Sequence, residues 1–292
     1  MKNKIFYRTV IINELNIFYR EAGKRERPVL LLLHGFPSSS HMFRNLITEL
    51  SDSFYIIAPD YPGFGQSSAP AIIEFNYTFD NLSQIIEKFI EQLQLSNITL
   101  YMQDYGGPVG MRIAARQPAL FRALIIQNAN AYTAGLGSLL QPLTAYAQNP
   151  DTENEKAVRF FLSLDATKWQ YLHGAADPDA IDPDSYITDQ YYLDRPGNDE
   201  IQLALFRDYG NNYPKYGEWQ QYFRSSAPDT LVIWGKNDAM FIAAGADAYK
   251  KDLPNAEVIY LDGGHCLLEE HYHQVAAIIK DFIHNRLSPQ TT

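Results

Sequence analysis

The chain has 292 residues, with 34 acidic and 24 basic side chains and a formal net charge of −10. This length suffices for one large α/β domain with an inserted subdomain. With 46 % hydrophobic and 20 % charged residues, the composition excludes a disordered or collagen-like chain. The acidic balance argues against a general nucleic-acid-binding protein, because that class needs a basic face to neutralise phosphates.

Neither a membrane nor an oxidising compartment is indicated by the sequence. No apolar stretch approaches the roughly 18 residues of a transmembrane helix. The stretch from Met1 to Ile5 does not open an apolar signal-peptide region. Cys266 is the single cysteine, which excludes a disulfide framework and is typical of a reducing compartment. We therefore expect a cytoplasmic monomer or small homo-oligomer that binds no membrane.

Strand and helix patterns alternate in the first part of the chain. Runs at Ile5 to Ile12 and Leu15 to Arg20 predict a hairpin of edge strands. Continuous apolar runs, typical of strands buried on both faces, then alternate with apolar residues at helical spacing. The predicted strands are Pro28 to Leu33, Phe54 to Ala58, Asn97 to Met102 and Phe121 to Gln127; the predicted helices are His41 to Leu50, Leu82 to Leu93 and Gly107 to Arg116. This order indicates a mostly parallel sheet covered by helices.

The pattern changes after Asn130. Residues 131–228 carry 14 acidic against 7 basic side chains and hold 10 of the 20 tyrosines. Helix-like stretches at Ala157 to Leu164 and Glu200 to Tyr209 are separated by turns rich in proline and aspartate. We expect residues 131–228 to form a helical cap over one edge of the sheet, inserted into a core of residues 1–130 and 229–292.

The α/β pattern returns at the end of the chain. The predicted strands are Leu231 to Trp234 and Glu257 to Leu261, and the predicted helices are Gly245 to Lys251 and His271 to Ile283. These elements extend the same predicted sheet.

Four short motifs follow predicted strands. In open α/β sheets, ligands bind beside the carboxyl ends of the strands, so these loops are candidates for chemistry. The motifs are His34-Gly35-Phe36-Pro37, Gln103-Asp104-Tyr105-Gly106-Gly107, Gly235-Lys236-Asn237-Asp238 and Gly263-Gly264-His265. Together they resemble the α/β-hydrolase superfamily, whose chain order is nucleophile, acid, histidine. The resemblance covers Lys4 to Asn130 and Pro228 to Leu287, and implies an α/β-hydrolase fold.

An aspartate, Asp104, stands where the common G-x-S-x-G motif of that superfamily has its serine. Gly106 and Gly107 fit the tight turn and allow the next helix to pack closely. An aspartate before a helix is also a common N-cap. With Asp238 and His265 in register, the resemblance favours Asp104 as a nucleophile. A carboxylate is already ionised at neutral pH, so it can attack a saturated carbon.

This arrangement resembles the aspartate-nucleophile branch, which includes haloalkane dehalogenases and epoxide hydrolases. The resemblance implies two steps: Asp104 forms an alkyl ester, and a water activated by His265 hydrolyses it. Asp238 orients the imidazole and balances its charge. Dehalogenases whose acid follows an earlier strand have a carboxylate where this chain has Asn128 and Asn130, so Asp238 is the predicted acid.

The loop that contains Phe36 resembles the oxyanion loop of the superfamily. The backbone N–H groups of Phe36 and Tyr105 are therefore predicted to bind the ester carbonyl oxygen as it becomes tetrahedral. No pattern indicates a metal or an organic cofactor. His271 and His273 are two residues apart and so do not share a helix face, and Gly63-Phe64-Gly65 lacks the third glycine of a dinucleotide-binding motif.

The leaving group is less clearly indicated than the nucleophile. The stretch from Gly63 to Ser67 resembles the corresponding stretch of haloalkane dehalogenases. A dehalogenase, however, must hold the departing halide with N–H donors. In that family these are a tryptophan after the nucleophile, with an asparagine after His-Gly or a tryptophan in the cap. Here Tyr105 and Phe36 stand at the first two positions. Trp169 is the candidate cap donor.

Epoxide hydrolases use hydroxyl groups of the cap, normally of two tyrosines, to protonate the opening epoxide oxygen. Tyr209 lies 29 residues before Asp238, about where such a tyrosine is expected. Tyr213 is its nearby substitute, and Tyr146 and Tyr171 are candidates for the second tyrosine. Because of this set of tyrosines, we favour epoxide opening over dehalogenation, with a small uncharged organic substrate and water as reactants.

Two other classes of function are weighed against this hypothesis. An ester or carbon–carbon hydrolase is disfavoured by the missing serine. A ligand-binding protein on a hydrolase scaffold, without turnover, is disfavoured because Asp104, Asp238 and His265 are all present.

Overall fold

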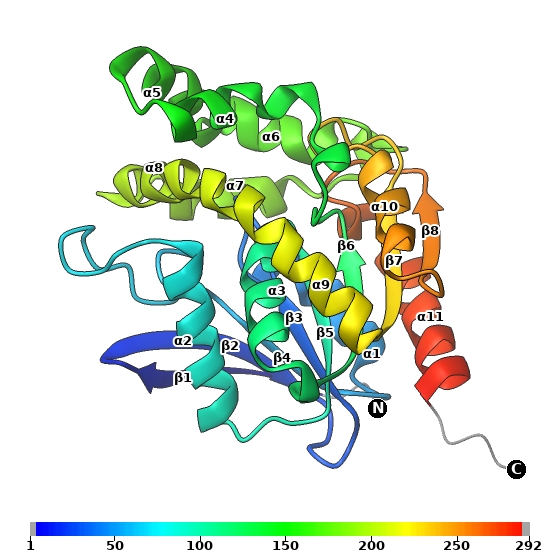
Figure 1. The fold of residues 1–292 in the computed structure, drawn as a ribbon. Helices are drawn as coiled ribbons and strands as arrows, with labels where there is room; N and C mark the ends of the chain where they lie inside the picture. Colours follow the sequence, from blue (N-terminus) through cyan, green and yellow to red (C-terminus); the bar gives the residue numbers. More distant parts are fainter. Residues whose placement is uncertain (1–3, 288–292) are drawn as a thin grey trace, which may run out of the picture.

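The computed structural model describes residues 4–287 as one mixed sheet with helices around it (Figure 1). Residues 1–3 and 288–292, which the predicted core includes, lie outside the described residues. The strands are β1 (Ile5–Ile12), β2 (Leu15–Ala22), β3 (Val29–Leu33), β4 (Tyr55–Pro59), β5 (Ile98–Gln103), β6 (Phe121–Gln127), β7 (Asp229–Gly235) and β8 (Glu257–Leu261). They form an eight-stranded sheet in the order β1-β2-β4-β3-β5-β6-β7-β8.

The sheet is antiparallel at one end and parallel elsewhere. β1 pairs with β2, and β2 with β4, in antiparallel register. All later pairs, from β4–β3 to β7–β8, are parallel. β2 thus lies between two strands, so the prediction of two edge strands is wrong for β2. The carboxyl ends of the parallel strands meet along one edge of the sheet.

Helices cover both faces of the sheet because alternate residues of each buried strand point to opposite sides. In β3, Leu31 and Leu33 belong to one core layer and Leu30 and Leu32 to the other. α2, α3, α9 and α10 pack on the first layer, and α1 and α11 on the second (Figure 1). These helices are α1 (Arg44–Leu50), α2 (Phe79–Gln92), α3 (Gly106–Arg116), α9 (Tyr216–Ser226), α10 (Ala244–Ala248) and α11 (Leu268–Leu287).

Residues 131–228, called here the helical segment, connect β6 to β7. Besides α9, this segment forms α4 (Gln141–Gln148), α5 (Thr152–Arg159), α6 (Leu164–Leu172), α7 (Pro183–Leu193) and α8 (Asn198–Asp208). Helices α4 to α8 lie beyond the carboxyl ends of the strands (Figure 1). Asp151, Ser163 and Asp182 begin α5, α6 and α7 by accepting a hydrogen bond from a backbone N–H of the first turn. Among residues 4–287, no helix has the length and apolar character needed to cross a membrane.

Candidate active site

Asp104 lies in the sharp turn between β5 and α3, with a φ of +48°. Few non-glycine residues adopt this left-handed conformation, and aspartate is one that tolerates it. The turn is tight: a Cβ on Gly106 would lie 2.2 Å from the Leu33 carbonyl oxygen. A Cβ on Gly35 would lie 2.2 Å from the Asp104 Cβ. The glycines therefore allow the loop after β3 to approach Asp104 directly.

The Asp104 side chain is buried, with 7 % of the residue exposed, and it is held by backbone donors. The Phe36 N–H donates to Oδ1 at 2.7 Å, and the Tyr105 N–H also hydrogen-bonds to the carboxylate. Burial raises the pKa of the Asp104 carboxyl to about 6, although His265 and the two N–H groups oppose this shift. The carboxylate is therefore predominantly ionised at neutral pH.

His265 lies beside Asp104 and bonds to Asp238. Its Nδ1 donates to Asp238 Oδ2 at 2.8 Å, because an ionised carboxylate only accepts. Its Nε2 is 3.9 Å from Asp104 Oδ2 and accepts a 3.1 Å hydrogen bond from Gln103 Nε2. Burial lowers the pKa of His265, but the charges of Asp238 and Asp104 outweigh burial and the net shift is upward. The three predicted side chains are thus brought together in one buried cluster.

Asp238 is held from several sides. The N–H groups of Met240 and Phe241 donate to Oδ1 at 2.8 and 3.0 Å. The side-chain amide of Asn128 donates to Oδ2 at 2.7 Å and accepts from the Gly235 N–H at 3.0 Å. Asn128 directly follows β6, at a position where some dehalogenases have their catalytic acid. It supports Asp238 by a hydrogen bond, a role that the sequence reading missed.

A small cavity of about 40 Å³ lies between the sheet edge and the helical segment, with Asp104 on its wall. Its core-side lining residues are Phe36, Asp104, Tyr105, Met240 and Phe241, and the helical segment contributes Leu140, Leu143, Phe161, Gln170, Phe206 and Tyr209. This space holds about one to three water molecules. The wall is mostly apolar, which suits a small uncharged compound.

Of the four predicted tyrosines, Tyr209 is the one that lines this cavity. Its hydroxyl makes no hydrogen bond within the described residues, and burial raises its pKa well above the ordinary value. Tyr213 packs edge-on against Tyr209, and its hydroxyl shares a 3.2 Å hydrogen bond with Thr144 Oγ1. Tyr209 therefore keeps its proton at neutral pH and lines the cavity, whereas Tyr213 packs against the ring of Tyr209.

The other three predicted substrate residues are Tyr146, Tyr171 and Trp169, and they are not among the residues that line this cavity. Tyr146 is buried within the helical segment and absent from the cavity wall. The Tyr171 hydroxyl donates to the buried Asp189 carboxylate. Trp169 is 37 % exposed and stacks on His173 at a ring distance of 4.3 Å. In each case, packing within the helical segment takes the side chain elsewhere.

Gln170, which the sequence reading passed over, does line the cavity. It lies on α6 between Trp169 and Tyr171 and is 3 % exposed. Its Nε2 is buried without a hydrogen-bond partner among the described residues. A glutamine within a helix is usually a solvated surface residue, so no signal in the sequence could have singled it out.

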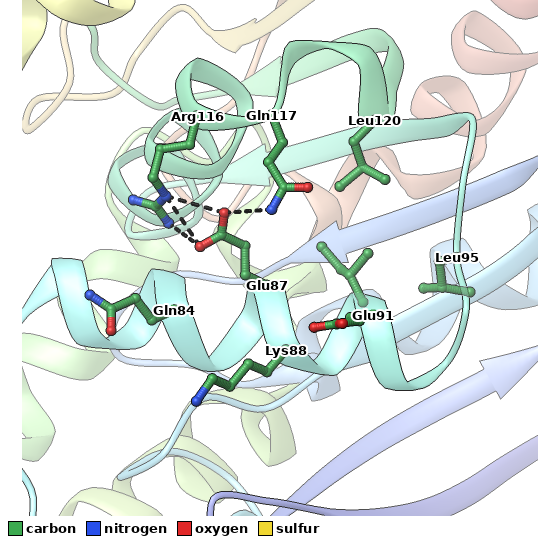
Figure 2. Close-up of a pocket in the computed structure, with 9 residues that line it drawn as sticks. Gln84, Glu87, Lys88, Glu91, Leu95, Arg116, Gln117 and Leu120 are labelled. Carbon is green, nitrogen blue, oxygen red and sulfur yellow. Dashed lines mark hydrogen bonds and ion pairs between the residues drawn. The ribbon is translucent and has the colours of Figure 1, made fainter.

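A larger hollow of about 800 Å³ is found elsewhere, at the opposite edge of the sheet. Leu95 and Leu120, which line it, precede the amino ends of β5 and β6. Figure 2 shows Arg116 and Gln117 reaching toward Glu87 across this hollow, where both donate to its carboxylate. Three of its polar side chains are thus paired with one another, and none of its lining residues is Asp104, Asp238 or His265. The Asp104 cavity is the candidate active site.

Within residues 4–287, no group of three or more His, Cys, Asp or Glu side chains could hold a metal ion.

The mostly parallel sheet and a nucleophile-like turn after β5 define the chain as a hydrolase of the α/β type. The family described as having the alpha/beta hydrolase fold matches residues 28–272. The chain belongs to this family, which confirms the fold predicted from the four motifs.

Among curated proteins, the chain is 40 % identical over 282 residues to an uncharacterized hydrolase of Saccharomyces cerevisiae, covering 95 % of this chain and 96 % of that protein. It is 38 % identical over 117 residues to a haloalkane dehalogenase of Psychrobacter cryohalolentis, covering 40 % of this chain and 38 % of that protein. The second match thus spans well under half of either protein. The chain is a hydrolase, and its resemblance to the dehalogenase branch is confirmed.

Solved structures have the same fold at low sequence identity. The haloalkane dehalogenase DatA of Agrobacterium tumefaciens superimposes with a TM-score of 0.81 at 23 % identity, over 96 % of this chain and 97 % of that one. Cfl2 of Burkholderia cenocepacia superimposes with a TM-score of 0.80 at 20 % identity, over 95 % of both chains. At this identity the similarity establishes the fold and leaves the reaction open.

Proposed function

We propose that this protein is a cofactor-free hydrolase that opens small uncharged epoxides, with Asp104 as the nucleophile. One observation carries the choice of leaving group: Tyr209, a residue with an acidic hydroxyl, lines the same cavity as Asp104. A phenol can give its proton to an epoxide oxygen. A departing halide calls for N–H donors instead; none of the described residues on the cavity wall is a tryptophan, and Gln170 carries the one side-chain N–H group among them.

In the first step, Asp104 attacks one epoxide carbon and the C–O bond at that carbon breaks. Oδ1 stays bound to the Phe36 N–H, so Oδ2 is the attacking atom. The oxygen that leaves the carbon takes the hydroxyl proton of Tyr209 and becomes an alcohol. The product is a hydroxyalkyl ester of Asp104, and the proton of Tyr209 is later restored from solvent.

In the second step, His265 removes a proton from water, and the resulting hydroxide attacks the ester carbonyl carbon of Asp104. The carbonyl oxygen becomes an oxyanion, which the N–H groups of Phe36 and Tyr105 stabilise. The intermediate then expels the diol, whose oxygen takes the proton from His265. Asp104 is left as a carboxylic acid that carries the second proton of the water, and it releases this proton to solvent to become a carboxylate again. Asp238 stabilises the imidazolium that exists between these events.

Ester formation itself prepares His265 for the second step. The Asp104 charge is one cause of the upward shift in the pKa of His265. When Asp104 becomes a neutral ester, that attraction disappears and the pKa of His265 falls. A neutral imidazole is the form that accepts a proton, so the loss of this attraction makes His265 a more readily available base in the ester form.

The helical segment is proposed to act as a cap that selects the substrate. It contributes six of the cavity-lining residues, including Tyr209. About 40 Å³ of free space admits only very small molecules, so larger substrates require side chains of the wall to move. The negative charge of the segment then belongs to its solvated outer surface and needs no charged partner.

Haloalkane dehalogenation is the second candidate, because several relatives with 38–42 % local identity carry that name. It would use the same attack by Asp104, with a halide leaving in place of the epoxide oxygen.

The test compares 1,2-epoxybutane with 1-bromobutane, using intact-protein mass of the His265→Gln variant to trap the ester. An epoxide adds its whole mass, because its oxygen stays attached, whereas a haloalkane adds only the alkyl group. We expect the epoxide adduct, its loss in Asp104→Asn, and a roughly 10²-fold slower formation in Tyr209→Phe. An alkyl adduct without an epoxide adduct would reverse the ranking, and no adduct from a broad panel of both classes would refute the covalent mechanism.

A further inference from the structure

Of the buried polar side chains of α6, Gln170 differs from Thr167 and Tyr171 because its side-chain amide nitrogen lacks a hydrogen-bond partner among the described residues. Thr167 donates to Gln190 at 2.8 Å, and Tyr171 donates to Asp189. The side chain of Gln170, equally buried, has no hydrogen bond within the described residues and lies on the wall of the Asp104 cavity. A buried amide without a partner costs stability, and in a native protein it calls for an explanation such as a missing ligand.

We propose that Gln170 is a further catalytic residue, whose side-chain N–H binds the leaving-group atom beside the Tyr209 hydroxyl. This inference rests on the proposed function, since it assigns a second donor to the same cavity. Gln170 on α6 and Tyr209 after α8 come from different parts of the helical segment and line one small space with Asp104. An oxygen leaving the attacked carbon lies within that space.

The two donors have different chemistry. A phenol can transfer its proton, whereas an amide N–H keeps it and only stabilises charge. During ring opening, the carbon–oxygen bond breaks as the Asp104 ester bond forms. The electron pair goes to the leaving oxygen, which takes the proton of Tyr209 while it accepts a hydrogen bond from Gln170. Because an amide N–H can also bind a halide, the site would hold a halide with this donor alone.

Gln170→Met is the decisive variant, because methionine has a similar length and volume but donates no hydrogen bond. Ester formation is measured in the His265→Gln background by intact-protein mass. The substrates are 1,2-epoxybutane and the three haloalkanes 1-chlorobutane, 1-bromobutane and 1-iodobutane. Ester hydrolysis is measured in protein with intact His265. Lys168→Ala, an exposed position on the same helix, is the matched control.

We expect Gln170→Met to slow epoxide opening by about 10²-fold. For the haloalkanes that react, the loss should shrink from chloride to iodide, because iodide leaves with less help. Ester hydrolysis should be unchanged, since the leaving group has already gone. The Tm should stay constant or rise, because an unpartnered amide has been removed.

Three outcomes would overturn the proposal. These are no slowing of ester formation, an equal slowing for every leaving group, and a lower Tm with a matching loss in both steps. A wild-type protein that forms no ester with any substrate would instead refute the proposed function itself, so the two failures are distinguishable.

Discussion

Replacing Asp104 by asparagine should stabilise the protein while abolishing ester formation. Asparagine has the same shape, tolerates the left-handed backbone at φ +48°, and keeps an oxygen that accepts the Phe36 N–H. It removes the buried negative charge. Because burial raises the pKa of Asp104 above its ordinary value of 3.8 to about 6, ionising this carboxyl costs more in the folded than in the unfolded chain.

The size of the gain follows from this shift. A difference of about two pKa units, at about 1.4 kcal/mol each, makes the ionised carboxylate destabilising by about 3 kcal/mol at pH 8. The folded state binds the proton more tightly, so this penalty grows as the pH rises from 4 to 6 and is fully present above pH 6. At pH 4.5 it falls to about 1 kcal/mol. For a chain of this length, 3 kcal/mol corresponds to a Tm rise of about 5 °C.

The assay is the free energy of unfolding in urea at pH 8 and pH 4.5, for the wild type and Asp104→Asn. Asp165→Asn, an exposed carboxylate at the start of α6, is the control and should change stability by less than about 0.5 kcal/mol. An Asp104→Asn variant that is no more stable than wild type at pH 8 would refute the reasoning. So would a gain that is the same at both pH values.

Three further predictions concern the surroundings of the nucleophile. Gly35→Ala places a Cβ 2.2 Å from the Asp104 Cβ, so the oxyanion loop must shift; we expect a 10²–10³-fold slower ester hydrolysis in single-turnover assays, and unchanged kinetics would contradict the assigned loop. Asn128→Ala removes a 2.7 Å hydrogen bond to the buried Asp238 and should lower the free energy of unfolding by about 1.5–3 kcal/mol in urea; a neutral result would mean that this bond is dispensable. Phe161 lies between the cavity and an apolar surface groove of about 640 Å³, so Phe161→Ala should raise kcat/KM for long-chain epoxides several-fold relative to 1,2-epoxybutane; equal ratios would exclude this route of entry.

The core of the fold could be predicted from the sequence because its signals are local. Strand patterns in the sequence predicted Phe121–Gln127 and Glu257–Leu261 with the bounds observed for β6 and β8. The helical segment was harder. A single helix was expected at Ala157 to Leu164, but Ser163 caps a new helix there, so the stretch divides between α5 and α6. Capping by a side chain is a competing local signal that apolar spacing does not contain.

The candidate site likewise contains residues that could be predicted from the sequence and residues that could not. Asp104, Asp238 and His265 could be found from the sequence because each lies in the loop that follows a strand, and parallel strands bring their carboxyl ends together. The cavity-lining residues of the helical segment could not be chosen in this way. Successive helical residues point about 100° apart, so Trp169, Gln170 and Tyr171 face three directions. Which of them meets the cavity depends on how α6 packs against the core, and this is a property of tertiary structure.

The energetics of Asp104 also bear on whether the scaffold is catalytic or merely binds a ligand. Asparagine would fit the same turn, accept the same backbone hydrogen bonds and remove a penalty of about 3 kcal/mol. A protein that only binds an apolar ligand has no physical use for a desolvated carboxylate at that point. A nucleophile does, because a carboxylate with little solvation attacks carbon more readily and loses less when it becomes a neutral ester. The free-energy cost of an ionised Asp104 therefore has a physical explanation if Asp104 is a covalent nucleophile. It has none if the protein only binds a ligand.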